Sequence, residues 1–267
     1  MRVKNRLLRV RRLLGAYKHA SNSKISKLRW LEFFRLFQPI KTEHSLIRLG
    51  AIRDGGYLIP DLLENITYCI SPGVAETFLF ENQLLEIYGI PSIMIDASID
   101  IPENLDPRMT FIQKYLGAFE DEQFITLQKL TENYGSLEQS MILQIDVEGF
   151  ELPVLFSCDE KTLNKYRIIV IEFHHLEHWV NSSLFDYFVE PSIKKLLENF
   201  TVVHSHPNNC DGTFKFGNRI YPMALEVTLL HNNFLRNDLY KNIYSDLPSE
   251  LDSDNSAELP SIKLRFD

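Results

Sequence analysis

The chain has 267 residues, of which 45% are hydrophobic, so it can form one large domain or a domain with appended segments. Its three cysteines (Cys69, Cys158 and Cys210) are scattered and form no C-x-x-C pair, which argues against a disulfide framework and a structural zinc site. A reducing, cytoplasmic setting is therefore the default expectation. No apolar run reaches the roughly 18 residues of a membrane-spanning helix, and the N-terminus does not resemble a secretory signal.

Charge is distributed unevenly along the chain. Residues 1–41 contain 12 Lys and Arg residues and one acid, a net charge of +11. The remaining residues contain 16 bases and 35 acids, a net charge of −19. The two parts are therefore expected to do different jobs. The acidic remainder would repel phosphates, so nucleic acid is disfavoured as a partner.

Two stretches of the basic segment have the apolar periodicity of helices. In the first, the apolar residues follow at alternating spacings of four and three: Val3, Leu7, Val10, Leu14 and Tyr17. In the second they are Leu28, Trp30, Leu31, Phe34 and Phe37. One interpretation is a basic amphipathic arm, residues 1–41, which rests on the anionic inner face of a membrane or on a partner. The alternative is a pair of helices packed on the body of the protein.

From residue 45 onward, strand and helix signals alternate. The turn Asp54-Gly55-Gly56 within "SLIRLGAIRDGGYLIP" predicts a β-hairpin. Strands are predicted over residues 66–71, 92–98, 109–117, 140–147, 166–174, 201–207 and 223–232. Helices are predicted over residues 75–89 and 120–135, from residue 151, and over 182–200, where Pro191 marks a break or a second start.

This alternation is typical of an α/β sheet with helices on both faces. The predicted domain covers residues 42–245. Residues 246–267 are acidic and rich in Ser and Pro, so they are predicted to form a mobile tail.

Ligands of open α/β sheets bind at the carboxyl ends of the strands. Gly73 follows the first predicted strand, and Asp96 ends the second, 23 residues later. This spacing fits a mononucleotide-binding unit in which the glycine admits the ligand and the carboxylate accepts the ribose hydroxyls. Gly117 and Ala118, after the third strand, could leave room for an adenine. Ordinary turn residues explain each of these positions as the alternative.

Acids and histidines follow the next three predicted strands. Asp146 ends one strand and is followed by Glu148 and Glu151; Glu172 and His174 end the next, and His206 the last. We expect Asp146, Glu172, His174 and His206 to face one cleft. A histidine paired with a carboxylate can take a proton from a hydroxyl, and Asp146, Glu172 and His206 are also a candidate ligand set for a divalent cation. Separate hydrogen-bonded or surface histidines are the alternative.

The stretch "LQIDVEGFELPVL" resembles the signature of FkbM-type methyltransferases. The segments "RLGAIRDGGYLIP", "SPGVAETFLFE", "IEFHHLE" and "HSHPNNCDG" followed by "PMALEVTLL" resemble those of bacterial members with a His-x-Asn-Asn motif. The resemblance covers roughly residues 46–234. It implies a Rossmann-like class I methyltransferase fold, with a mostly parallel seven-stranded sheet and one antiparallel strand. It also implies S-adenosylmethionine (SAM)-dependent O-methylation of a sugar, glycan or related metabolite, as in polysaccharide biosynthesis.

The resemblance also implies roles for individual residues. Those expected at the cofactor are Gly73, Glu76, Asp96, Ser98, Gly117, Ala118 and Asp146. His206 or His174 is expected to be the general base, oriented by Asp146 or Glu172, with Mg²⁺ or another divalent cation as a variant. Three positions depart from the family pattern. Ser71 replaces an acid, Ala75 replaces the second glycine, and Gln144 replaces a common lysine.

Two other functions remain open from the sequence. One is a metal-dependent hydrolase or transferase that uses the same acids and histidines without SAM. The other is a membrane-associated scaffold without catalysis, in which residues 1–41 carry the function. The sequence identifies neither the acceptor nor the oligomeric state.

Overall fold

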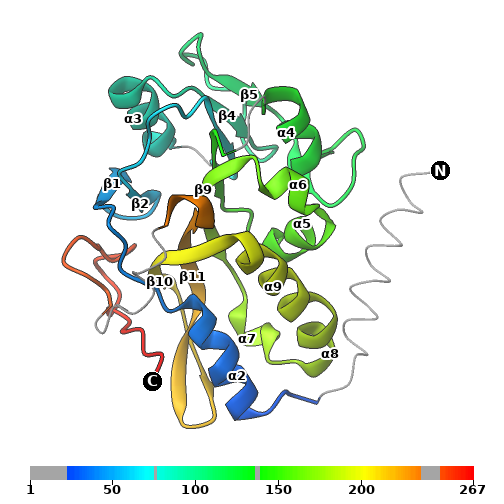
Figure 1. The fold of residues 1–267 in the computed structure, drawn as a ribbon, viewed down its shortest axis with the longest axis vertical. Coiled ribbons are helices and arrows are strands. Elements are labelled where there is room, and N and C mark those ends of the chain that lie inside the picture. Colours follow the sequence, from blue (N-terminus) through cyan, green and yellow to red (C-terminus); the bar gives the residue numbers. More distant parts are fainter. Residues whose placement is uncertain (1–22, 75–76, 136–138, 236–246) are drawn as a thin grey trace.

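The computed structural model describes residues 23–74, 77–135, 139–235 and 247–267 and contains a central seven-stranded sheet (Figure 1). Its strands, in chain order, are β3 (Tyr68–Pro72), β4 (Ser92–Ile95), β5 (Thr110–Ile112), β8 (Met141–Ile145), β9 (Tyr166–Phe173), β10 (Phe200–Phe216) and β11 (Arg219–His231). Across the sheet their order is β10-β11-β9-β8-β3-β4-β5. Most of their residues are apolar and buried, as expected for strands covered on both faces.

Strand direction confirms the predicted mixed sheet. The pairs β3–β4, β3–β8, β4–β5 and β8–β9 are parallel, whereas β11 is antiparallel to both of its neighbours, β9 and β10. The chain runs outward from β3 to β4 on one side and later adds β8 on the other. The order of the strands therefore reverses beside β3, where open α/β sheets have a ligand-binding crevice at their carboxyl edge.

Two layers cover the sheet (Figure 1). On one face lie the hairpin of β1 (Leu46–Gly50) and β2 (Gly56–Pro60), as predicted, and helix α3 (Leu79–Tyr88). The other face is covered by helices that contribute to the largest buried apolar cluster. Their bounds are α2 (Lys27–Phe34), α4 (Leu127–Tyr134), α5 (Glu151–Ser157), α6 (Glu160–Leu163), α7 (Leu176–Trp179) and α9 (Glu190–Asn199). No helix in the described ranges is long and apolar enough to cross a membrane.

Helix α2 is the second of the two helices predicted in the basic segment, and it packs against the body of the protein. Ser26 caps its N-terminus by accepting a hydrogen bond from the backbone N–H of Arg29. Trp30, Phe33 and Phe34 are buried, and a 3₁₀ turn, η1 (Arg35–Phe37), continues the helix. For this stretch the packed alternative holds. The first predicted helix lies outside the described residues, as does most of the basic segment.

The ring contacts of this helix reach distant parts of the chain. Trp30 lies 5.6 Å from Tyr221 between ring centroids, and Phe33 lies 4.8 Å from Phe185. Phe34 stacks on Phe266 at 5.3 Å. The helix therefore joins the β10–β11 hairpin, the helical layer and the end of the chain into one core.

Two predicted elements were wrong in their bounds. The strand predicted over residues 109–117 is split into β5 and β6 (Tyr115–Gly117). The helix predicted from residue 120 begins only at Leu127, because residues 124–126 form β7 (Phe124–Thr126), which pairs in parallel with β6. The sequence Phe-Ile-Thr is aromatic and β-branched, which suits a strand, and Thr126 then caps α4.

The helix predicted over residues 182–200 is present in three pieces. A short α8 (Ser182–Leu184) is followed by a π-helical turn, η2 (Phe185–Val189), and then by α9. Pro191 lies in the first turn of α9, where its missing N–H is tolerated. It therefore marks the second start that was predicted as one of two alternatives.

The C-terminal segment, residues 247–267, is packed rather than mobile, contrary to the sequence-based prediction. Leu247, Leu264 and Phe266 are buried in the largest apolar cluster, and the carbonyl of Phe266 accepts a hydrogen bond from Arg35. The prediction was based on the acidic, Ser-rich composition of the segment. Three widely spaced apolar residues are enough to pack it against the core despite that composition.

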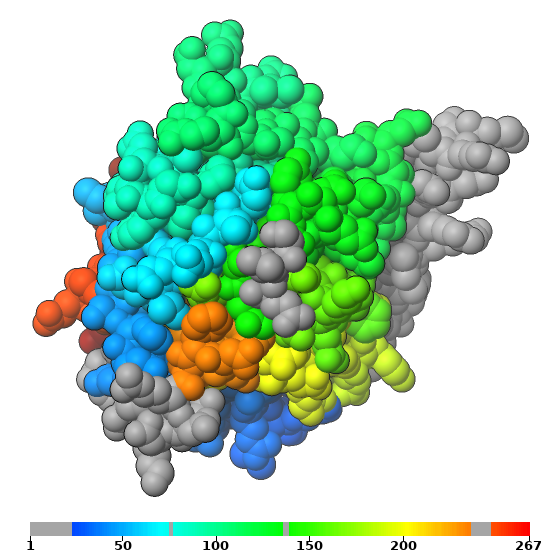
Figure 2. Space-filling model, turned by 45° about the horizontal axis from the view of Figure 1, so that its top comes forward, coloured from blue at the N-terminus to red at the C-terminus, as the bar shows by residue number. Residues whose placement is uncertain are grey.

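The end of β11 lies beside the start of β9, because the two strands are antiparallel, and Figure 2 shows the surface there. There η3 (Asn232–Phe234), in orange, lies between the blue N-terminal part of the described chain and the yellow region around residue 200. The carbonyl of Phe234 is 2.9 Å from Nε2 of His44, and the Arg167 guanidinium lies 4.5 Å from the Phe234 ring.

Candidate functional site

A cavity of about 280 Å³ lies at the carboxyl ends of β3, β4 and β8, at the place where the strand order reverses. Its walls are largely apolar, formed by Ile95, Tyr115, Leu116, Phe124, Val147 and Phe150. Three acids, Asp96, Asp146 and Glu148, also line it. This combination of apolar walls and a few polar groups is typical of a small-molecule site.

Four of the residues predicted at the cofactor line this cavity: Gly73, Asp96, Ser98 and Asp146. Gly117 and Ala118 are not among the lining residues, although their neighbour Leu116 is. Glu76 lies outside the described residues. Four of the residues that were predicted together thus share one cavity, and a role for any of them in cofactor binding stays a prediction.

Gly73 allows two strand ends to approach each other closely. Its φ is +84°, and a Cβ atom there would overlap the carbonyl oxygen of Asp146. The two segments are also joined by a hydrogen bond of 3.1 Å from the Asp146 N–H to the carbonyl of Pro72. The protein itself therefore requires a glycine here, whatever the cavity binds.

Asp96 is held in a defined orientation on the cavity wall. Its Oδ1 accepts hydrogen bonds from the backbone N–H of Ser98 at 2.7 Å and from the Ser98 hydroxyl at 2.6 Å. The turn that the sequence offered as the alternative is therefore present; Asp96 also lines the cavity, and its contact with a ribose stays a prediction.

Gly117 acts on the cavity through Phe124. A Cβ at residue 117 would lie 2.7 Å from Cδ1 of Phe124, so the glycine leaves room for this ring beside β6. Phe124 in turn contacts Tyr115 and Phe150, with ring centroids 5.7 and 6.5 Å away. The wall predicted to accommodate adenine is thus an aromatic one.

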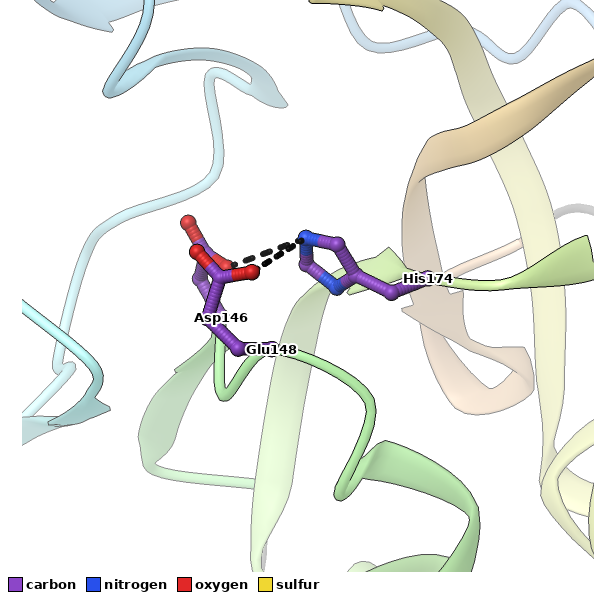
Figure 3. Close-up of side chains that lie close together, drawn as sticks. All are labelled: Asp146, Glu148 and His174. Carbon is purple, nitrogen blue, oxygen red and sulfur yellow. Dashed lines mark ion pairs between the residues drawn. The ribbon is translucent and has the colours of Figure 1, made fainter. Parts of the chain in front are cut away.

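Asp146, Glu148 and His174 meet at the edge of this cavity (Figure 3). Nε2 of His174 lies 3.7 Å from Oδ1 of Asp146 and 3.7 Å from Oε2 of Glu148. All three ligand-type atoms lie within 4.8 Å of one another. In the described part of the chain this is the one such group of three. The predicted metal set of Asp146, Glu172 and His206 shares only Asp146 with it.

Glu151 fixes the other side of the His174 ring. Nδ1 of His174 donates to Oε1 of Glu151 at 3.0 Å, and both side chains are buried. The same oxygen accepts hydrogen bonds from the backbone N–H groups of Val147 and Gly149 at 3.3 and 3.1 Å. The third carboxylate of the signature "DVEGFE" is therefore tolerated inside because it has three donors.

The pKa values in this cluster are shifted upward. Burial raises the pKa of Asp146 to about 8, aided by the nearby charges of Glu148 and Glu151 and opposed by His174. Burial by itself would lower the pKa of His174, but the hydrogen bond to Glu151 and the surrounding carboxylates outweigh it and raise the pKa to about 9. The cluster therefore holds protons at neutral pH, and His174 in this state is not prepared to accept another.

Glu172 connects the cluster to a buried polar row across the sheet. Its Oε1 lies 3.7 Å from Nε2 of His174 and accepts a hydrogen bond of 2.6 Å from Nδ2 of Asn208. In the strand register Glu172 pairs with Glu226, and Glu226 pairs with His206, so all three share one face of the sheet. Burial raises the pKa of Glu172 and of Glu226.

His206 belongs to this row. The sequence had predicted it at a strand end, and this prediction was wrong. It lies inside β10, which continues to Phe216, and it is not among the residues that line the cavity. Its Nδ1 is 3.2 Å from Oδ1 of Asp252, and Nε2 of His204 is 3.0 Å from the same oxygen. Asp146, Glu172 and His174 therefore lie close together, although of these three only Asp146 lines the cavity, while His206 has its own acidic partner.

Five residues of the polar row were missed from the sequence: Asp54, Asn208, Glu226, Asp252 and Asn255. Nδ2 of Asn255 donates to Oε1 of Glu226 at 2.7 Å and to Oδ1 of Asp54 at 3.0 Å. Glu226 could have been identified from the sequence, because it is an acid within the apolar strand "MALEVTLL". Asp54, Asp252 and Asn255 could not, because polar residues are common in a turn and in a polar segment.

Two positions that depart from the family pattern, Ser71 and Gln144, contact each other in the interior. The Ser71 hydroxyl contacts the Glu81 carboxyl and lies 2.8 Å from Oε1 of Gln144. Nε2 of Gln144 donates to the Tyr57 hydroxyl at 3.1 Å. Burial raises the pKa of Glu81. The departures thus form a hydrogen-bonded chain behind the crevice.

Comparison with known proteins agrees with the sequence signature. Residues 109–211 match the family model described as the methyltransferase FkbM domain. One solved structure, a 30S ribosomal A1408 methyltransferase from an uncultured bacterium, aligns with a TM-score of 0.30 and 9% identity. That alignment covers 69% of this chain and 100% of the other chain, and a likeness this weak supports no conclusion. No curated protein matches this chain.

Proposed function

We propose that this chain transfers a methyl group from SAM to a hydroxyl group of an acceptor, because residues 109–211 match the model of the methyltransferase FkbM domain. The observation that carries the proposal is the cavity at the reversal of strand order, with Asp96 and Asp146 on its wall. This is where open α/β sheets bind nucleotide-like ligands.

The lining of the cavity fits the three parts of SAM. The aromatic and apolar wall around Leu116 and Phe124 suits an adenine, which is flat and can stack. The oriented carboxylate of Asp96 is suited to accept hydrogen bonds from ribose hydroxyls. Glu148, which lines the cavity and is exposed to solvent, supplies a negative charge beside which a sulfonium cation would be stabilised.

The acceptor is proposed to be a hydroxyl compound, such as a sugar or glycan. Carboxylates accept hydrogen bonds from hydroxyl groups, and Glu148 presents one, with 86% of its side chain exposed at the edge of the cavity. Of the two histidines predicted as general base, only His174 lies at this edge. His206 is directed to Asp252 instead.

The reaction requires alignment above all. Bound SAM supplies an electrophilic methyl group on sulfur. The acceptor oxygen would form a bond to that carbon as the carbon–sulfur bond breaks, and the electrons of the broken bond would stay on sulfur. The hydroxyl proton must leave. The protein contributes by holding the oxygen about 3 Å from the methyl carbon, which supplies much of the rate enhancement.

Calorimetry with S-adenosylhomocysteine tests the cofactor site directly. We expect the wild type to bind it, and D96N to bind it about 10- to 100-fold more weakly, because hydrogen bonds to a charged group are lost. D100N is the matched control, since Asp100 is exposed and does not line the cavity. Absence of binding to the wild type would contradict the proposal. A methyl-transfer assay with a panel of saccharides then tests the acceptor class.

A further inference from the structure

We propose that Asp146, Glu148 and His174 bind one divalent cation at the edge of the cofactor cavity, and that this cation binds the acceptor hydroxyl. The inference rests on the proposed function for its chemistry, but the cation site rests on geometry alone. On this proposal His174 is a metal ligand rather than the general base.

The spacing of the three side chains suits an ion. Nε2 of His174 lies 3.7 Å from each of the two carboxylate oxygens, which is too long for direct hydrogen bonds. Atoms bound about 2.1 Å from one ion lie up to about 4.2 Å apart, so these separations leave room for an ion between them. Figure 3 shows Nε2 directed toward both carboxylates.

One ligand atom is in a state that a cation would relieve. Oδ1 of Asp146 is buried and has no hydrogen-bond partner among the described residues. A buried acceptor without a donor destabilises the protein, so it requires an explanation. It is the same oxygen that lies 3.7 Å from His174.

The shell behind the ligands is already in place. His174 is only 6% exposed, and Glu151 orients its ring through Nδ1. Metal-binding histidines commonly donate their second ring nitrogen to a carboxylate in this way, which directs the other nitrogen at the metal. Glu151 is in turn held by two backbone N–H groups. Glu148, in contrast, is exposed and can close on the ion from the solvent side.

The ligand types indicate the class of cation. One imidazole and two carboxylates, with open positions for water and a hydroxyl, suit a Mn²⁺-like ion better than a soft metal. Such an ion lowers the pKa of a bound hydroxyl, so that its proton can leave to water beside Glu148 without a protein base.

Electron paramagnetic resonance titration of the whole protein with Mn²⁺, without SAM, tests the site. We expect one bound Mn²⁺ per chain, and affinity at least 10-fold weaker in E148Q and D146N. E151Q, which leaves the ligands intact, should weaken affinity about 10- to 100-fold by loosening His174. E122Q is the control, because Glu122 is exposed and outside the cluster. Equal Mn²⁺ binding in wild type and E148Q, or no binding to the wild type, would overturn the proposal.

A parallel titration with S-adenosylhomocysteine in the presence of a chelator separates this inference from the proposed function. If S-adenosylhomocysteine binds and Mn²⁺ does not, the methyltransferase proposal stands and the cation site is wrong. If Mn²⁺ binds and S-adenosylhomocysteine does not, the cation site stands and the proposed methyl transfer is wrong.

Discussion

Gly73 lies so close to Asp146 that a Cβ atom at residue 73 would overlap the Asp146 carbonyl oxygen. This contact holds the loop after β3 against the end of β8 and thereby shapes the floor of the cavity. We predict that G73A is destabilised by more than about 2 kcal/mol, because it adds both a clash and a strained positive φ. Urea unfolding of the purified variant measures this.

The matched control for this change is G89A. Gly89 ends α3 with a φ of +70°, and a Cβ there would meet nothing within 4 Å. G89A should therefore lower the free energy of unfolding by only about 1 kcal/mol, the cost of a side chain at a positive φ. Equal losses in the two variants would mean that the approach of Gly73 to Asp146 is not tight.

The second prediction concerns the attachment of α2. Trp30 has no exposed surface and contacts five other aromatic rings, so W30A should lower the free energy of unfolding by about 3–5 kcal/mol. Leu28 is on the same helix but 64% exposed, and L28A should change it by less than about 0.5 kcal/mol. Denaturant titration compares the two. A helix that acted only as a detachable arm would tolerate both changes.

The third prediction is a pH dependence of stability centred on Asp252. Burial alone would raise the pKa of Asp252, but its contacts with His204 and His206 outweigh burial and lower it. Burial alone would lower the pKa of His206, but Asp252 and Glu226 outweigh it and raise it. The lowered carboxyl pKa adds stability above about pH 4, which is lost on acidification, and the raised imidazole pKa adds stability below about pH 6.5, which is lost as the pH rises.

The contribution of this group of side chains should therefore be largest between about pH 4 and 6.5. D252N should remove about 3 kcal/mol there, because it leaves buried histidines without their counter-charge, and its stability should vary less with pH. Thermal unfolding from pH 3 to 9 provides the profile. D211N serves as control, since Asp211 is exposed. Parallel profiles for wild type and D252N would rule out this role of Asp252.

The fourth prediction concerns the aromatic wall of the cavity. Phe124 lines it, whereas Phe119 contacts Phe124 at 5.2 Å between ring centroids without lining it. F124A should weaken S-adenosylhomocysteine binding by about 10-fold, the loss of one aromatic contact, and F119A should have little effect. Calorimetry of both variants gives the comparison. If F119A weakened binding as much as F124A, the ligand would not rest on this wall.

The sequence was sufficient to predict those parts of the site that depend on the order of strands along the chain. Asp96, Asp146, Glu172 and His174 each follow or end an apolar run, and parallel strands bring such ends to one edge of a sheet. The sheet itself was predictable for the same reason. Periodicity identifies a strand from its own residues and needs no partner.

The remaining parts depend on contacts between residues far apart in the chain. Asp252 reaches His206 from a segment whose composition indicates mobility, and Asn255 donates hydrogen bonds both to Glu226 and to Asp54, which lies 201 positions before it in the chain. The strand at residues 124–126 was absorbed into a predicted helix because it exists only by pairing with β6. The local sequence pattern does not indicate which distant segments will pair.

Both tryptophans of the protein belong to the aromatic core around α2: Trp179 lies 6.4 Å from Phe33 between ring centroids, and neither indole lines the cavity. Intrinsic indole fluorescence will consequently monitor how firmly that helix is seated. Ligand titrations need a different optical signal, for which the tyrosine and phenylalanine rings beside the crevice are the natural source. A shift in emission on adding a ligand would then signify that the distant core, too, had rearranged.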